Sequence, residues 1–261
     1  MSRYSGTLLG AHQRIDRLAR RNLERLLPHS SFPRTRSILH FEGHNGPDAI
    51  KRKSPAHNEP WHYLRPFDTD DNQLIELIEL HYKSLTRALK QRDSVRASFE
   101  AAWLAHAVVD GLTPAHHYPY EEKLVELADG RSITERTSIG KKLILPGKTP
   151  SKRLKNNWRM WGPKGLFITH AGFEMGVAVI LLPLKFRTPP SAERVARFEA
   201  ASLSEWFRSL AQEVARLELY DAFYETGWTI ALAKRIRREL APLLVEAVAL
   251  VWYGAAADAK R

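Results

Sequence analysis

Apolar residues recur every three, four or seven positions along most of the chain, which is the spacing of one face of an α-helix. The segment 70–90 is the plainest case, with Leu74, Leu77, Ile78, Leu85 and Leu89. The same spacing predicts helices over 8–27, 94–110, 191–227 and 228–257, with a break near Pro242. No alternating run is long enough for a sheet, and no repeat with a period of about 20–50 residues is present. We therefore expect an all-α fold, a multi-helix bundle in which residues 1–261 form a single domain.

Two segments interrupt the helical pattern. Residues 28–68 are rich in His, Pro, Asn and Gly, and residues 129–165 are polar and basic. The second segment has ten Lys/Arg against two acidic residues, a local net charge of +8. We interpret 129–165 as a loop-like basic insertion that holds most of the excess charge of the chain.

The whole chain of 261 residues has a formal net charge of +11, which favours an anionic partner such as nucleic acid, an anionic lipid surface or a phosphate-bearing substrate. The alternative is that the charge serves solubility alone. The chain contains no cysteine, so thiolate zinc sites are excluded and a metal ion would be held by His, Asp or Glu.

The hydrophobic segments do not predict a membrane span or a leader. The first apolar stretch, residues 7–11, is shorter than the apolar region of a signal peptide, which is about 7–15 residues long. The apolar stretch 240–257 is interrupted by Pro242 and Glu246 and falls short of the ~20 residues of a span. We expect a buried core helix there, no transmembrane segment, and a cytoplasmic protein.

The motif with the strongest chemical signal lies at the end of the helix predicted over 94–110. His106 and Asp110 are four residues apart and share one helical face, and after Gly111 and Pro114 the chain turns so that His116 can approach the same place. Two imidazoles and a carboxylate suit zinc. The alternative is a surface ion pair, but the surrounding face is apolar, and a buried carboxylate needs a partner.

Further histidines and carboxylates extend the pattern. His170 and Glu174 form a second pair four residues apart, which is by itself a weak signal. The loop 46–62 contains Asp48 and His62, where a polar, solvated loop is the alternative interpretation. His12 lies in the first predicted helix, where a lone histidine is usually structural. We interpret the remaining ones as surface residues or as supports for the ligands: His29, His40, His44, His57, His81 and His117.

The order and spacing of these residues resemble the zinc-dependent phospholipase C family and its relatives, the S1/P1 nucleases. The pattern of that family is a His in the first helix, an Asp in a loop, a His fourteen residues later, His-x3-Asp-x5-His at a helix end, and His-x3-Glu or His-x3-Asp. This chain matches it with His12, Asp48, His62, His106, Asp110, His116, His170 and Glu174, over roughly residues 6–175.

The resemblance implies the fold of that family and a cluster of two or three zinc ions. It assigns His62, His106 and Asp110 to one ion. A second ion would use His116, His170 and Glu174. Asp110 would also bridge to a third ion held by His12, and Asp48 would orient or deprotonate the attacking water. The family begins with an N-terminal Trp that completes the third site, whereas this chain begins Met1-Ser2. The 54-residue separation of His116 and His170 is also longer than in the familiar secreted members, and the basic insertion lies within it.

Three functions remain open at this point. The resemblance favours a zinc-dependent phosphodiester hydrolase that cleaves a phospholipid head group, with 129–165 in peripheral contact with an anionic membrane. An S1/P1-like nuclease is the alternative, because Trp158 and Trp161 lie among basic residues, a composition suited to single-stranded nucleic acid. The third possibility is a non-catalytic metal-binding member of the fold.

Overall fold

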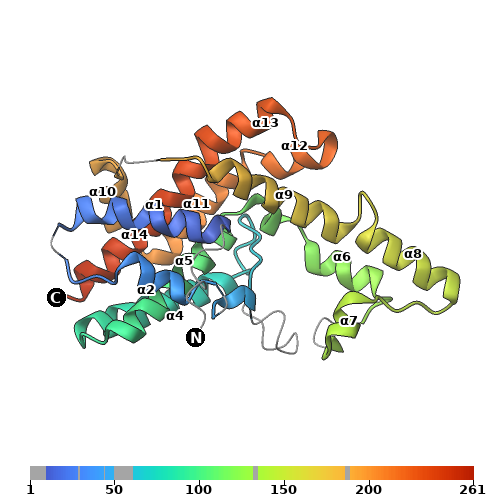
Figure 1. Ribbon diagram of the computed structural model, residues 1–261, viewed down its shortest axis with the longest axis horizontal. Helices are drawn as coiled ribbons and strands as arrows, with labels where there is room; N and C mark the ends of the chain where they lie inside the picture. The colour runs from blue at the N-terminus through green and yellow to red at the C-terminus, as the bar shows by residue number, and fades with distance from the viewer. Residues whose placement is uncertain (1–9, 29, 44, 50–60, 132–134, 186–188) are drawn as a thin grey trace.

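The computed structural model describes residues 10–28, 30–43, 45–49, 61–131, 135–185 and 189–261. The described chain is all-α and contains no strand, as the periodicity predicted. Figure 1 shows the elements in chain order. Their bounds are α1 (Ala11–Leu26), α2 (Thr35–His40), α4 (Gln73–Lys90), α5 (Ser94–Gly111), the 3₁₀ turn η2 (Pro114–His117), α6 (Tyr120–Leu127), α7 (Ile139–Leu143), α8 (Pro150–Trp161), α9 (Leu166–Leu181), α10 (Ala192–Ala200), α11 (Leu203–Ala215), α12 (Leu219–Thr226), α13 (Ile230–Arg235), the π segment η4 (Ile236–Leu240) and α14 (Ala241–Asp258).

The C-terminal helix α14 lies at the centre of the main bundle, packed against α1, α4 and α5 (Figure 1). Most of its side chains are buried, so the expectation of a core helix over 240–257 is confirmed. Trp252 is completely buried, and its indole N–H donates to the carbonyl of Ala101 on α5 at 2.9 Å. This contact fixes the depth of α5 in the bundle, and α5 is the helix that carries the central candidate ligands.

The predicted break near Pro242 is wrong. Helical structure runs without interruption from Ile230 to Asp258, with a π segment at Ile236–Leu240 and Pro242 in the first turn of α14. Proline lacks the N–H that a continuing α-helix would require, and the π segment changes the hydrogen-bond register just before it. The helix therefore continues past the proline.

The predicted helix over 191–227 is three helices in the structure: α10, α11 and α12. Ser202 begins α11 with a capping box, in which its side chain accepts from the Glu205 backbone while the Glu205 side chain accepts from the Ser202 N–H. Glu218 precedes α12 with a φ of 50° and so takes the left-handed conformation. Each boundary turns the chain, so these helices wrap the bundle and do not extend from it.

The interpretation of 129–165 as a loop is also wrong, because the segment contains α7 and α8. Thr149 caps α8 by accepting from the N–H of Lys152, and Pro150 occupies the first turn. Together α6, α7 and α8 form an arm that projects from the main bundle (Figure 1). The arm has a small core of its own, made of Tyr120, Leu124, Ala128, Leu145 and Met160.

Helix α9 joins the arm to the bundle. Its Phe173, Val177 and Leu181 belong to the main core. Arg14 of α1 donates to the carbonyls of Leu181 and Leu184 at the far end of α9. This contact sets α1 alongside α9, and so brings the first turn of α1 toward the end of α5.

Candidate metal centre

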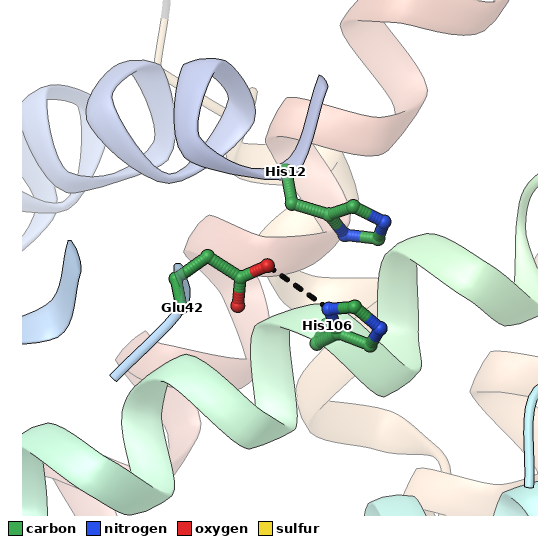
Figure 2. A group of neighbouring side chains, drawn as sticks. All are labelled: His12, Glu42 and His106. Carbon is green, nitrogen blue, oxygen red and sulfur yellow. Dashed lines mark hydrogen bonds and ion pairs between the residues drawn. The ribbon is translucent and has the colours of Figure 1, made fainter. Parts of the chain in front are cut away.

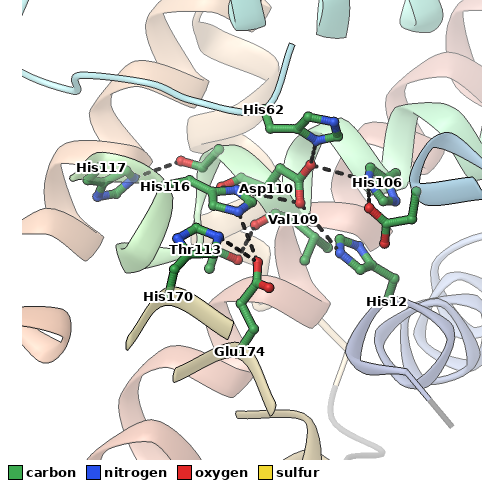
Figure 3. Close-up of polar contacts among 12 residues, drawn as sticks. His12, His62, His106, Val109, Asp110, Thr113, His116, His117, His170 and Glu174 are labelled. Atoms are coloured by element: carbon green, nitrogen blue, oxygen red, sulfur yellow. Dashed lines mark hydrogen bonds and ion pairs between the residues drawn. The ribbon is translucent and has the colours of Figure 1, made fainter. Parts of the chain in front are cut away.

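Asp110 is the centre of a group of four histidines drawn from four parts of the chain: His12, His62, His106 and His116 (Figure 3). It lies in the last turn of α5, where its side chain is 3% exposed. One carboxylate oxygen contacts His62 Nδ1 and lies 3.2 Å from His106 Nε2, and the other lies 3.4 Å from His12 Nε2 and 3.6 Å from His116 Nδ1. A single carboxylate with histidine nitrogens on both oxygens is a candidate bridging ligand.

A second group adjoins the first. The 3₁₀ turn η2 carries His116, and α9 carries His170 and Glu174 four residues apart, as the sequence predicted. Glu174 Oε1 lies 3.0 Å from His116 Nε2 and 3.3 Å from His170 Nε2. The two imidazole rings are stacked 5.1 Å apart. The turn at η2 therefore lets His116 face the helix that lies 54 positions later in the chain.

Described residues form three groups that could each hold a metal ion, with ligand atoms within 4.8 Å of one another: His62, His106 and Asp110; His116, His170 and Glu174; and His12, Glu42 and His106. Two nitrogen or oxygen ligands on one tetrahedral zinc are separated by about 3.3 Å, because each bond is about 2.0–2.1 Å. The observed contacts of 3.0–3.4 Å between imidazole and carboxylate match this separation. Several exceed the usual N–H···O distance of about 2.9–3.0 Å. The donor sets therefore fit a metal ion.

Two of the histidines, His106 and His116, have a hydrogen-bond acceptor at Nδ1. His106 Nδ1 lies 2.9 Å from Glu42 Oε1, as Figure 2 shows, and both side chains are buried. His116 Nδ1 lies 3.1 Å from the backbone oxygen of Asp110. An acceptor at Nδ1 holds the proton there and leaves the lone pair of Nε2 for a metal ion, which is the usual arrangement of histidine ligands.

The carboxylates and histidines of the cluster shift one another's pKa values. Burial alone would raise the pKa of Asp110, but the surrounding histidines, His106 foremost, hold it well below its usual value. Glu174 behaves in the same way, because His116 and His170 hold its pKa well below the usual value despite burial. Burial alone would lower the pKa of His106, and the neighbouring carboxylates raise it well above its usual value. The histidines therefore favour the ionised form of both carboxylates, which is the form that binds a metal ion.

The candidate ligands form one end of a cavity of about 1400 Å³. His12, Asp48, His62, Asp110, His170 and Glu174 all line it. The arm also lines the cavity, with Arg136, Lys142, Leu143, Met160 and Trp161. Apolar residues of α9 and α14 (Phe167, Met175 and Leu244) and acidic residues of α6 (Glu121, Glu122 and Glu126) complete it. The cavity is large enough for a substrate with both polar and apolar parts.

Asp48 lies at the rim of the cluster. Its Oδ1 is 3.8 Å from His106 Nε2, and its side chain is 55% exposed. Among the predicted site carboxylates it is the most exposed, since the side chain of Glu174 is 42% exposed and that of Asp110 is 3% exposed. His12 lies against Asp110, with its ring stacked 4.1 Å from His106. The N-terminal residues 1–9, which include Met1 and Ser2, lie outside the described residues, as do His29, His44 and His57.

The interpretation of His81 as a surface or supporting residue is wrong. It is buried between α4 and α5, with Nδ1 2.6 Å from Glu100 Oε2 and its ring beside Trp103, and neither residue belongs to the cluster. His40 is exposed as expected, next to Asn45. His117 is turned away from the cavity and bonds the backbone oxygen of Gly111 at 2.9 Å, and burial lowers its pKa to about 4. It therefore supports the turn that presents His116.

Sequence reasoning missed Glu42, Tyr63 and Tyr120. The only sequence signal for Tyr63 was its place next to His62, and for Tyr120 and Glu42 there was none. The rings of Tyr63 and Tyr120 stack 5.6 Å apart beside His116 and His170. Burial raises the pKa of both phenols well above the usual value, so both hydroxyls stay protonated at the cavity wall. They can act as hydrogen-bond donors to an anion.

Comparison of the chain with known protein families and with characterised proteins returns no match in either case.

Proposed function

We propose that this protein is a metal-dependent phosphodiester hydrolase of the zinc-dependent phospholipase C type. The observation that carries the proposal is the position of Asp110, whose two carboxylate oxygens face histidines of adjoining ligand groups at the end of a large cavity. Zinc suits the all-His/Asp/Glu donor set, and the three groups have room for two or three ions. Clustered zinc ions, when bound, polarise phosphoryl oxygens and make water a stronger nucleophile.

Each residue then has a defined task. The histidines and the carboxylates of Asp110 and Glu174 hold the ions, and Glu42 fixes the ring of His106. Asp48, exposed at the cavity rim, accepts the proton of the attacking water, a role that typically contributes ~10²–10⁴-fold in rate. The protonated phenols of Tyr63 and Tyr120 donate to the anionic ester.

The cavity wall favours a lipid-like ester. Phe167, Met175 and Leu244 provide an apolar surface beside the ligands, while Arg136, Lys142 and three glutamates of α6 make other parts of the same wall polar and charged. An ester with an acyl or glyceryl part and a phosphate uses both kinds of wall. The alternative of a nuclease is favoured by one observation: Trp158 is 67% exposed beside Arg159, an arrangement that can stack on a base.

The test is metal analysis followed by turnover of defined phosphodiesters. Purified protein should contain two or more zinc ions per chain and should hydrolyse bis(p-nitrophenyl) phosphate and a short-chain phosphatidylcholine until a chelator is added. Asp110→Asn should lose both metal and turnover. Glu100→Gln removes a buried glutamate in the same helix that contacts His81 and not the cluster, and it should keep both.

Protein that neither retains nor takes up zinc contradicts the metal cluster. Protein that binds zinc but hydrolyses no phosphodiester contradicts the enzymatic part and leaves the non-catalytic metal-binding function. Selective cleavage of single-stranded oligonucleotides, with no cleavage of the lipid, establishes the nuclease alternative.

A further inference from the structure

The exposed side of α8 carries two large apolar residues among its cations. Leu154 and Trp158, four residues apart on one side of the helix, are 74% and 67% exposed. The opposite side carries Asn156 and Met160, which are buried against the arm. A helix in a soluble protein normally turns its apolar side inward, so this exposed pair needs an explanation.

Helix α9 continues the exposed apolar surface. Ile168, Met175 and Val179 lie on one side of this helix at spacings of seven and four, and they are 41%, 67% and 59% exposed. Phe167, 37% exposed, contacts Trp161 of α8 with ring centroids 4.7 Å apart. We define the apolar face as Leu154, Trp158, Phe167, Ile168, Met175 and Val179.

The buried fraction of the helices that carry the apolar face is much lower than that of the apolar core helix. Two helical stretches of the described chain are long and apolar enough to cross a membrane: Pro150–Leu181 and Ile230–Asp258. The protein itself buries 72% of the apolar window of Ile230–Asp258 but only 28% of that of Pro150–Leu181. The latter contains α8 and α9, while its His170 and Glu174 contact His116. Such a helix pair can lie on a membrane surface without spanning it.

Along the sequence, the charge of the stretch that carries most of the apolar face is of one sign. No acidic residue occurs between Glu135 and Glu174, while the same interval holds Arg136, Lys141, Lys142, Lys148, Lys152, Arg153, Lys155, Arg159 and Lys164. On α8, Lys155 and Arg159 are exposed beside Leu154 and Trp158. Among the described residues no carboxylate forms an ion pair with either cation. Two copies of this face would repel each other, so a second copy of the chain is a poor occupant.

We infer that the apolar face and its flanking cations dock on the surface of an anionic phospholipid bilayer. The aliphatic side chains enter the interface, and the lysines and arginines meet the lipid phosphates. Nucleic acid fits less well, because Leu154, Ile168 and Val179 offer a base neither stacking nor hydrogen bonds. Phe167 and Met175 belong both to this face and to the wall of the large cavity, so docking would bring the cavity mouth to the membrane.

This inference goes beyond the proposed hydrolysis, because docking requires neither metal nor turnover. Binding is measured by flotation of the full chain with vesicles of phosphatidylcholine alone and of phosphatidylcholine mixed with phosphatidylserine. Leu154→Ser with Trp158→Ser should weaken binding to the mixed vesicles by at least about tenfold, the factor that burial of one large apolar side chain contributes. The matched control is Leu80→Ser with Val95→Ser, two exposed apolar residues on α4 and α5, which should bind as wild type.

A second pair of substitutions tests the contribution of the positive charge on α8 and leaves the apolar residues intact. Lys155→Gln with Arg159→Gln should weaken binding to the mixed vesicles by more than about tenfold, because each cation near an anionic surface contributes about fivefold. The control is Arg87→Gln with Lys90→Gln on α4, where both side chains are exposed. Circular dichroism verifies that every variant is folded.

Three outcomes overturn the inference. One is wild-type protein that does not bind the mixed vesicles, and another is an equal loss in the control variants. The third is a protein that binds a labelled single-stranded oligonucleotide but no vesicle, with the loss confined to the Lys155 and Arg159 variant, since that pattern assigns the surface to nucleic acid.

Discussion

Glu42→Gln should weaken zinc binding without changing the number of ions bound. In the wild type, Glu42 Oε1 lies 2.9 Å from His106 Nδ1, which is the length of a charge-assisted hydrogen bond. The two side chains are 1% and 2% exposed, so water does not screen the contact. Glutamine keeps the shape and removes the charge. A buried hydrogen bond to a charged group contributes about 1.5–3 kcal/mol, which corresponds to about 10–100-fold in affinity. Loss of a carboxylate behind a histidine ligand typically has the same effect.

The chain offers a close control for this experiment. Glu100 is also 1% exposed and also contacts a histidine Nδ1, that of His81 at 2.6 Å. Glu100→Gln should lower the midpoint of thermal unfolding much as Glu42→Gln does, because both substitutions weaken a buried charged hydrogen bond. Its zinc affinity, measured by competition with a chromophoric chelator, should equal that of the wild type.

Either of two results would refute this reasoning about Glu42. Wild-type zinc affinity in Glu42→Gln would mean that the carboxylate does not hold the ring of His106 in its binding orientation. An equal loss of affinity in Glu100→Gln would mean that general destabilisation explains the effect. If mass spectrometry instead finds one ion fewer per chain in Glu42→Gln, the carboxylate is itself a ligand, together with His12 and His106.

Three further predictions concern the cluster. Asp110→Asn should lower the zinc content by more than one ion, because Asp110 faces histidines on both of its oxygens, and elemental analysis measures this directly. Asp48→Asn should keep the zinc content and lower kcat by ~10²–10⁴-fold, and wild-type kcat would place the base elsewhere. Zinc binding should weaken as the pH falls, because imidazole binds a cation only when it is deprotonated. The carboxylates that raise the pKa of His106 in the metal-free chain move this loss to higher pH than for an isolated histidine, and calorimetry across a pH series reports the proton release.

The features of the structure that could be predicted are those that depend on the spacing of residues within one segment of the chain. Helices over 94–110 and 70–90 follow from apolar periodicity, and the pairing of His106 with Asp110 follows from their separation of four residues. Helix α8 was missed because its few apolar residues are divided between an exposed side, with Leu154 and Trp158, and a buried side, with Met160, so they form no single stripe. The start of α8 could nevertheless be predicted, since Thr149 followed by Pro150 is a typical helix beginning.

The rest depends on contacts between distant parts of the chain. Glu42 supports His106 from 64 positions away, and no local pattern marks such a pair. The division of 191–227 into three helices depends on caps, of which the Ser202–Glu205 box was visible in the sequence and the left-handed Glu218 was not. Whether Asp48 reaches solvent is likewise set by the surrounding fold and not by its neighbours in sequence.

The separate core of the arm has a consequence for how the molecule opens. Five buried residues, from α6, α8 and the segments that follow α6 and α7, form the core of the arm, whereas the cluster residues of α5 are anchored in the much larger main core. Segments with little buried surface open locally at a lower free energy than the global unfolding of the protein. Backbone amides of α8 should therefore exchange with deuterium well before those of α5 and α14. Because the arm forms one wall of the cavity, these local openings would widen the entrance for a bulky molecule while the ligand residues of α5 keep their positions.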